Sequence, residues 1–268
     1  MELSIPTARI DGVQVSCLGF RDTVALVARW LDVGRGRRIA TANLDFLRLA
    51  ARDAEFRFAL ATCDLVTADG WPVVLLARRG AGRSPNPDAV RPKERVAGSD
   101  LVPALAAECA RLGRSVYLLG GHPGTGEGAA ARLVAANPGL RIAGTSSVRV
   151  DLDDVAACAA VAAAIRATGA DLLLVGLGAP KQDRFLADWI HATGVRVGIG
   201  VGGTFDFLSG RIARAPRPVR AVGMEWLWRL LREPRRLTTR YLAAAAHLVR
   251  LLGPETTRRR PRPAVARS

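Results

Sequence analysis

Short apolar runs alternate with longer amphipathic segments along most of this chain, and this alternation constrains its fold more than any other feature. Runs bounded by Gly, Pro or polar residues predict β-strands, and the segments of helical spacing between them predict α-helices. Regular strand–helix alternation favours an α/β, Rossmann-like fold, in which a mostly parallel sheet carries helices on both faces. Residues 116–119 and 172–175 are apolar throughout, as is typical of strands buried on both faces.

The expected core strands cover residues 38–41, 64–67, 115–119, 140–144, 171–177 and 195–201. The expected helices cover residues 23–32, 44–61, 100–112, 126–136, 154–168 and 180–193. In sheets of this kind, ligands bind beyond the carboxyl ends of the strands. The residues that directly follow each strand are therefore the first candidates for a binding site.

The C-terminal part of the chain differs in composition from the rest. After residue 210, amphipathic helices are expected at residues 221–231 and 237–252, with Pro234 between them. We therefore expect an α/β domain at residues 1–210, an Arg- and Trp-rich helical appendage at 211–252, and a disordered basic tail at 253–268. Residues 80–93 are rich in Gly, Pro and Arg, which favours a surface loop or lid.

Positive charge is concentrated in the same C-terminal part. The chain has a net charge of +15, and residues 211–268 hold fifteen Arg and three Glu, a net +12. This distribution predicts a polyanionic partner: membrane phospholipid, a diphosphate or nucleic acid. Arginine suits bidentate phosphate contacts, although a GC-rich genome would explain the preference for Arg over Lys equally well.

Several other classes of protein are disfavoured by the sequence. Cys17, Cys63, Cys109 and Cys158 are widely spaced and form no Cys/His cluster, so neither a zinc site nor a disulfide framework is expected. The first residues lack the pattern of a signal peptide. No window has the roughly 18 uninterrupted apolar residues that a membrane-spanning helix needs. We therefore expect a cytoplasmic protein with reduced thiols.

Glycines and short polar residues follow several of the predicted strands. Backbone N–H groups in glycine turns and at helix N-termini bind phosphate oxygens, so these positions suit an anionic ligand of nucleotide size. The candidate positions are Thr41, Asn43, Asp69, Gly120, Gly121, Gly178, Pro180, Gln182, Gly202 and Gly203.

Each of these signals also has an ordinary structural explanation. Asp69 fits the N-cap of a helix that begins at Trp71, and Thr41 and Asn43 fit turn positions. Residues 151–153 match the short Asp-x-Asp metal motif, but the triplet precedes a predicted helix, which favours capping. We therefore expect no metal site from this motif alone.

A set of longer segments narrows these alternatives because they occur together in one order. They are Thr-Ala-Asn (41–43), Ala-Asp-Gly (68–70), Arg-Val-Ala-Gly-Ser-Asp-Leu (95–101), Gly-Ala-Pro-Lys-Gln (178–182), Gly-Val-Gly-Gly-Thr-Phe-Asp (200–206), Arg-Ala-Pro (214–216), and Glu-Trp-Leu-Trp-Arg-Leu with Glu-Pro-Arg-Arg (225–236). In these segments the chain resembles the WecG/TagA/CpsF glycosyltransferases, glycosyltransferase family 26. The resemblance covers about residues 39–241.

The resemblance implies an activity and its substrates. Members of this family transfer a sugar, often N-acetylmannosamine or its uronic acid, from a UDP donor with inversion at the anomeric carbon. The acceptor is a polyprenyl-diphosphate-linked sugar, so the enzyme is expected at the inner face of the cell membrane, held peripherally on an anionic surface. No cofactor is expected, and metal independence is implied, with Mg²⁺ or Mn²⁺ left open. A homo-oligomer is also left open, and no nucleic-acid partner is expected.

The resemblance also implies roles for individual residues. Asp69 is expected to be the general base, with Thr41 and Asn43 positioning the substrate beside it. Arg95 and Gln182 are expected to contact the donor. The remaining substrate-binding candidates are Gly120, Gly121, Gly178, Pro180, Gly202 and Gly203 in the α/β domain, and the diphosphate-binding Arg214, Arg229, Arg236 and Arg240 in the appendage.

Some features depart from the family pattern, and two rival functions stay open. Asp183 stands where Glu commonly follows Pro-Lys-Gln, and the loop at residues 80–93 is longer than usual. These departures bear on donor specificity more than on catalysis. The basic, Trp-containing appendage is also compatible with nucleic-acid binding, and the strand-end glycines with a non-catalytic nucleotide-binding module.

Overall fold

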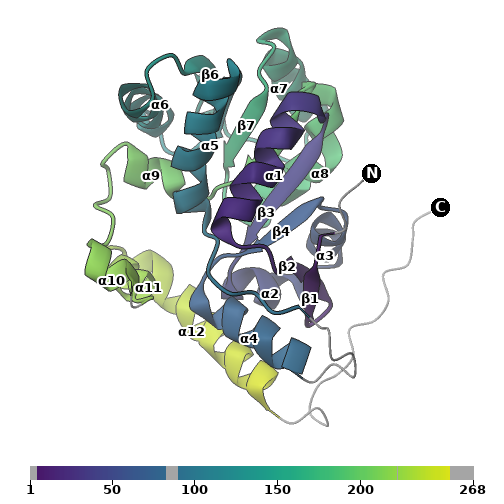
Figure 1. Cartoon of the computed structure of the whole chain (residues 1–268), viewed down its shortest axis with the longest axis vertical. Helices are drawn as coiled ribbons and strands as arrows, with labels where there is room; N and C mark the ends of the chain where they lie inside the picture. The colour runs from purple at the N-terminus through teal and green to yellow at the C-terminus, as the bar shows by residue number, and fades with distance from the viewer. Residues whose placement is uncertain (1–4, 83–89, 222, 254–268) are drawn as a thin grey trace, which may run out of the picture.

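A computed structural model describes residues 5–82, 90–221 and 223–253 of the chain, and Figure 1 shows its arrangement. The core is a six-stranded parallel sheet in the order β4-β3-β8-β7-β5-β6. Its strands are β3 (Arg37–Ala42), β4 (Leu65–Ala68), β5 (Ser115–Gly120), β6 (Arg141–Ser146), β7 (Leu172–Gly176) and β8 (Val197–Gly200). The predicted α/β fold with a parallel sheet is therefore confirmed.

Helices cover both faces of this sheet, and each strand alternates its side chains between them. Leu172 and Leu174 of β7 pack toward α1 (Phe20–Val33), α5 (Gly98–Leu112) and α6 (Thr125–Ala136). Leu173 and Val175 pack instead toward α7 (Val155–Ala167) and α8 (Lys181–Thr193). Burial of both faces explains why this strand is apolar throughout.

A third apolar cluster lies at the β4 edge of the sheet. It joins β3 and β4 to α2 (Leu44–Ala50), α3 (Ala54–Ala61), α4 (Trp71–Gly82) and a small antiparallel hairpin, β1 (Thr7–Ile10) and β2 (Val13–Ser16). The prediction of one helix over residues 44–61 is wrong, because the structure has two helices there. Helix α2 ends at Ala50. The Asp53 carboxylate then accepts a hydrogen bond from the Phe56 amide and so caps a separate helix, α3.

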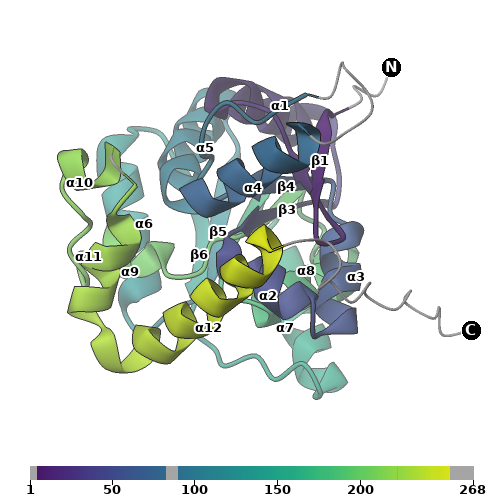
Figure 2. The ribbon, with the colours of Figure 1, turned by 90° about the horizontal axis from the view of Figure 1, so that it is seen from below.

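The C-terminal segment runs through short helices away from the sheet and then returns across the molecule as one long helix (Figures 1 and 2). It contains α9 (Thr204–Leu208), α10 (Arg217–Ala221), α11 (Glu225–Arg232) and α12 (Pro234–Leu252). Two amphipathic helices were expected here, and α11 and α12 correspond to them with shifted ends; α12 begins at Pro234, where a helix tolerates proline. We use the term appendage for residues 211–252.

The appendage packs on the α/β domain through α12, which lies against α2. The Arg79 guanidinium also donates a hydrogen bond to the Leu252 carbonyl oxygen at 3.1 Å, which ties α12 to α4. Within the described ranges, no helix combines the length and apolarity that crossing a bilayer requires. Residues 80–82 of the loop expected at 80–93 belong instead to α4. Half of that loop (residues 83–89) and nearly all of the expected basic tail (254–268) lie outside the described residues.

Candidate active site

The carboxyl ends of neighbouring strands bring the predicted strand-end residues to one edge of the sheet. Asp69 directly follows β4, Asn43 follows β3, and Gly202 lies just beyond β8. Gly178 and Gly121 follow β7 and β5 in the same way. Because all these strands are parallel, the candidate residues share one edge, as expected for ligand sites in such sheets.

Asp69 is half-buried, and its surroundings raise the pKa of its carboxyl group to about 6. Burial is the largest cause; nearby Arg95 and Arg229 act in the opposite direction, while Glu225 and Asp100 add to the increase. At the start of α4, the Val73 and Val74 amides donate to the Gly70 carbonyl oxygen, which gives no support to the alternative role of Asp69 as a helix cap.

Arg95 and Arg214 lie in a closed ring of ion pairs with Asp100 and Glu225. Arg95 Nη1 is 3.0 Å from Glu225 Oε2, and Arg95 Nη2 is 2.9 Å from Asp100 Oδ2. Arg214 completes the ring with Nη2 at 2.6 Å from Asp100 Oδ1 and Nε at 3.3 Å from Glu225 Oε1. Each carboxylate therefore gives one oxygen to each arginine, and the ring joins the α/β domain to the appendage.

Arg229 is the predicted arginine that extends over the glycine turn after β8. A Cβ atom built on Gly203 would lie 3.1 Å from Arg229 Nη2, so the guanidinium passes directly over this turn. The group also lies over the Phe207 ring, 5.1 Å from its centroid. Its Nε is buried without a hydrogen-bond partner within the described ranges, which leaves a donor for an anionic ligand.

The other predicted arginines of the appendage have different surroundings. Arg236 pairs with Glu233 at 2.7 Å and is largely exposed. Arg240 Nε lies 2.6 Å from Asp45 Oδ2 at the start of α2. This ion pair connects α12 to the residues that follow β3. The roles predicted for Arg236 and Arg240 in diphosphate binding stay predictions.

Thr41 and Asn43 have local structural partners in addition to their predicted roles. The Thr41 hydroxyl is buried and donates to the Gly200 carbonyl oxygen at 3.0 Å, which links β3 to β8. Asn43 caps α2, because its Oδ1 accepts hydrogen bonds from the Asp45 and Phe46 amides. These bonds account for the residue types without any substrate, so the role in substrate positioning stays a prediction.

Gln182 connects two of the glycine turns. Its Oε1 accepts hydrogen bonds from the amides of Gly178 at 3.1 Å and Gly202 at 3.0 Å. The side chain is only 1% exposed. In this arrangement Gln182 shapes the turns after β7 and β8, and its predicted contact with the donor stays a prediction. Pro180 precedes α8, the helix that carries Gln182.

The ends of β5 and β7 approach too closely for a side chain at Gly120. Its φ of +92° lies in the region that glycine tolerates best, and an added Cβ would lie 3.0 Å from the Gly176 carbonyl carbon. Gly121 hydrogen-bonds across the same gap, donating its amide to the Gly176 carbonyl oxygen at 3.1 Å. These glycines therefore keep the turn after β5 tight beside the turn after β7.

Asp183, the residue that departs from the family pattern, is buried next to Gln182. Neither carboxylate oxygen has a hydrogen-bond partner of good geometry among the described residues. Burial raises the pKa of its carboxyl group to about 8, although its own amide and the Gln182 side chain are close enough to favour the charged form. An added Cβ at Gly200 would lie 3.1 Å from Asp183 Oδ1, so this carboxyl group packs behind β8.

A metal site is not visible in the described part of the chain, where no cluster of three or more His, Cys, Asp or Glu side chains could hold an ion. The expected capping of a helix by the Asp-x-Asp triplet is wrong, because the cap of α7 is the next residue, Asp154, which accepts from the Ala157 amide. Asp151 instead accepts from the Asp153 amide at 3.3 Å.

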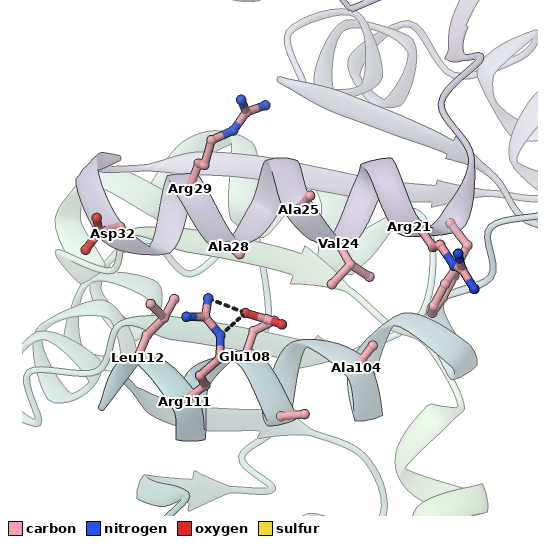
Figure 3. A pocket seen from close by; sticks show the side chains of 12 residues that line it. Arg21, Val24, Ala25, Ala28, Arg29, Asp32, Ala104, Glu108, Arg111 and Leu112 are labelled. Carbon is pink, nitrogen blue, oxygen red and sulfur yellow. Dashed lines mark hydrogen bonds and ion pairs between the residues drawn. The ribbon is translucent and has the colours of Figure 1, made fainter.

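One hollow on the described surface lies away from these strand ends. It has a volume of about 630 Å³ and lies between α1 and α5 (Figure 3). Ala25, Ala28 and Ala104 line it, together with an ion pair between Arg111 and Glu108. None of the candidate site residues lines this hollow, so we place the site at the strand ends on chemical grounds.

Glu225 and Asp100 are the residues at this site that the sequence analysis did not assign. Both lie within segments that carried the family resemblance, and each has an arginine of its own segment within five residues, Arg95 for Asp100 and Arg229 for Glu225. Glu225 is 8% exposed. The sequence signal that could have identified Glu225 is its place as the single acid at the start of a basic, apolar helical segment.

Comparisons with known proteins identify the family of this chain. Residues 8–261 match the family described as "Glycosyl transferase WecG/TagA/CpsF family". A Bacillus subtilis (strain 168) protein named N-acetylglucosaminyldiphosphoundecaprenol N-acetyl-beta-D-mannosaminyltransferase is 27% identical over 209 residues, which cover 78% of this chain and 77% of that protein. The family match spans both the α/β domain and the appendage. The chain therefore belongs to the WecG/TagA/CpsF family of glycosyltransferases.

Proposed function

We propose that this glycosyltransferase moves N-acetylmannosamine or a related sugar from a UDP donor to a polyprenyl-diphosphate-linked sugar, with inversion at the anomeric carbon. The name of the Bacillus subtilis relative supports both the transferred sugar and the lipid-diphosphate acceptor. The observation that carries the proposal is Asp69, a half-buried carboxylate with a raised pKa at the carboxyl edge of the sheet, with Arg95 and Arg229 nearby.

In this proposal Asp69 acts as the base of a single displacement. Its carboxylate accepts the proton of the acceptor hydroxyl as that oxygen attacks the anomeric carbon, and the bond from this carbon to UDP breaks. A carboxyl pKa of about 6 keeps Asp69 ionised at neutral pH while making it a stronger base than an ordinary aspartate. A positioned base contributes on the order of 10²–10⁴-fold to such a step.

The departing diphosphate needs positive charge, and Arg229 supports that role. Its buried, unpartnered Nε would gain a hydrogen-bond acceptor when an anion lies over the Gly203 turn. Arginine neutralises a leaving phosphate without a metal ion. We therefore propose metal-independent transfer and no cofactor.

The outer face of α12 supports attachment to a membrane surface. Leu242, Val249 and Leu252 are exposed on this helix at helical spacing, and Leu231 is exposed on α11. Exposed apolar side chains beside arginines are typical of helices that lie in the plane of an anionic bilayer surface. We propose that this face holds the enzyme on the cytoplasmic leaflet, where a lipid-linked acceptor is found.

A turnover screen tests the proposal. The full-length protein is offered a panel of UDP-sugars with a polyprenyl-diphosphate-linked N-acetylglucosamine acceptor, with and without EDTA. We expect transfer from UDP-N-acetylmannosamine or a close relative, unchanged by EDTA. Absence of transfer with every donor, together with a salt-sensitive shift of DNA, would favour a nucleic-acid-binding protein instead.

A further inference from the structure

The ion-pair ring formed by Arg95, Asp100, Arg214 and Glu225 is held near the strand end that carries the proposed base. The amide of Val96, next to Arg95, donates to the carbonyl oxygen of Ala68, next to Asp69, at 2.9 Å. Both Asp100 and Glu225 affect the Asp69 carboxyl group electrostatically, as does Arg95. The side chains of Arg95 and Glu225 are 17% and 11% exposed, so water screens their charges less than it would at the surface. The charges of this ring therefore influence how readily the Asp69 carboxylate takes up a proton.

Arg95 lies close enough to Asp69 to act on its charge, but its ion-pair partners are the two acids of the ring. Its Nη1 faces Glu225 and its Nη2 faces Asp100, at 3.0 and 2.9 Å. A lone arginine next to a carboxylate would lower the pKa of that carboxylate and weaken it as a base. Here the negative charges of Glu225 and Asp100 offset the positive charge of Arg95 at Asp69.

Glu225 is the acidic residue that the appendage contributes to the ring. It lies at the start of α11, and its other oxygen accepts from Arg214, which also donates to the Ser99 hydroxyl at 2.8 Å. Asp100, by contrast, belongs to α5 of the α/β domain. The charge balance at Asp69 is thus complete only when the appendage is in place.

We propose that Glu225 is a positioning residue for the transfer reaction, which pairs with Arg95 and so keeps the positive charge of Arg95 from weakening Asp69 as a base. This inference rests on the proposed function in taking Asp69 as the base. The charged groups that act on Asp69 are Arg95, Arg229, Glu225 and Asp100. Of these, Arg229 and Glu225 come from the appendage, with opposite effects.

The test is a carboxyl titration of Asp69 by NMR in full-length protein labelled with ¹³C at aspartate, with Asp69→Asn used to assign the signal. In the unsubstituted protein we expect a midpoint near 6. Glu225→Gln removes the negative charge and frees Arg95, so the midpoint should fall by roughly one pH unit. Glu225→Asp should restore part of the loss, and Glu108→Gln, in the hollow between α1 and α5, should leave the midpoint unchanged.

Arg214→Gln separates this electrostatic role from simple loss of docking. It removes the other arginine of the ring but leaves the contact between Arg95 and Glu225, so the midpoint should stay near that of the unsubstituted protein. Hydrogen exchange of the α11 amides reports docking in each variant. An unchanged midpoint in Glu225→Gln, or an equal fall in Arg214→Gln, would overturn the role assigned to Glu225.

Turnover measurements then connect the titration to catalysis. In Glu225→Gln the acid limb of the rate–pH profile should move to lower pH by the same amount, with a lower plateau because the base is weaker. The NMR midpoints need no substrate. Absence of sugar transfer in every protein would therefore count against the proposed function, whereas an unmoved midpoint would count against Glu225.

Discussion

At the scale of single residues, Asp69 illustrates how opposing effects set the strength of a base. Burial raises its pKa to about 6, with Arg95 and Arg229 acting to lower the pKa and Glu225 and Asp100 acting to raise it. A carboxylate in contact with arginines alone would have an unusually low pKa and would be a poor proton acceptor. The acids Glu225 and Asp100 are therefore as relevant to the site as the arginines.

The first prediction concerns the pH dependence of transfer. The base must be ionised, and its pKa is raised to about 6, so activity should fall as pH drops through about 6. Below that value the rate should decrease about tenfold per pH unit. Turnover measured between about pH 4.5 and 8 checks this expectation. A flat profile across this range would exclude a titrating carboxyl of this kind as the base.

The second prediction concerns the buried carboxyl of Asp183 and the stability of the fold. Its folded-state pKa, about 8, is above that of an unfolded aspartate, so the folded protein keeps a proton that the unfolded chain loses. The free energy of unfolding should therefore decrease as pH rises from about 4 to about 8. Asp183→Asn should remove that decrease. Its stabilising effect relative to the unsubstituted protein should therefore be larger at pH 8 than at pH 4, by a few kcal/mol.

Urea unfolding at these two pH values measures the effect of Asp183→Asn. Asp153→Asn serves as the control, because Asp153 is exposed beside α7. If the unsubstituted protein and Asp183→Asn showed parallel pH dependence, a protonated Asp183 in the folded state would be ruled out.

At the scale of elements, the sequence predicted the parallel sheet because the strands are buried on both faces. Such strands are continuously apolar, and their limits can be read within a few residues, as for β5 and β7. The hairpin of β1 and β2 was missed although its signal was present. Asp11-Gly12 stands between alternating apolar residues, and both residues adopt positive φ as a tight hairpin turn requires.

The break between α2 and α3 was not predicted because periodicity alone does not detect it. The apolar spacing continues through residues 44–61, whereas the helix stops at the local hydrogen bond formed by Asp53. Side-chain bonds of this kind compete with the helix and depend on the geometry of a few atoms. The same reason explains why Asn43 was identified only as a turn or site residue, and not as the cap of α2.

The third prediction concerns the link that Gln182 makes between two turns. Gln182→Ala removes the acceptor of the Gly178 and Gly202 amides, leaving donors that lose their partner. The fold should lose about 1–3 kcal/mol of stability, and UDP affinity should fall because the turns lose their shape. Thermal unfolding and UDP titration calorimetry measure the two effects. Undiminished UDP affinity in a destabilised variant would show that these turns do not shape the donor site.

At the scale of the whole molecule, the appendage lies at the strand ends and brings basic side chains to them. Sequence composition predicted a basic appendage, but it could not show which arginines reach the site, because that depends on contacts between distant segments. Arg229 lies over the Gly203 turn, whereas Arg236 and Arg240 pair with Glu233 and Asp45. Glu225 went unassigned for the same reason, since its partner Arg95 is far away in the sequence.

The fourth prediction concerns the exposed apolar face of α12. Val249 is 71% exposed, and Val249→Glu adds a negative charge to the surface proposed to contact lipid. Sedimentation with anionic liposomes should decrease markedly. Val155→Glu, at an equally exposed valine on α7, should sediment like the unsubstituted protein. Equal loss in both variants, or in neither, would remove α12 as the lipid-binding face.

The central claim is that Asp69 is the base of a sugar transfer at the carboxyl edge of the sheet, and one measurement tests it most directly. Transfer from UDP-N-acetylmannosamine to the lipid-diphosphate acceptor is measured for the unsubstituted protein and for Asp69→Asn, with UDP binding measured in both. We predict a loss of at least about 10²-fold in turnover with UDP binding retained. Turnover by Asp69→Asn at the rate of the unsubstituted protein would contradict the claim.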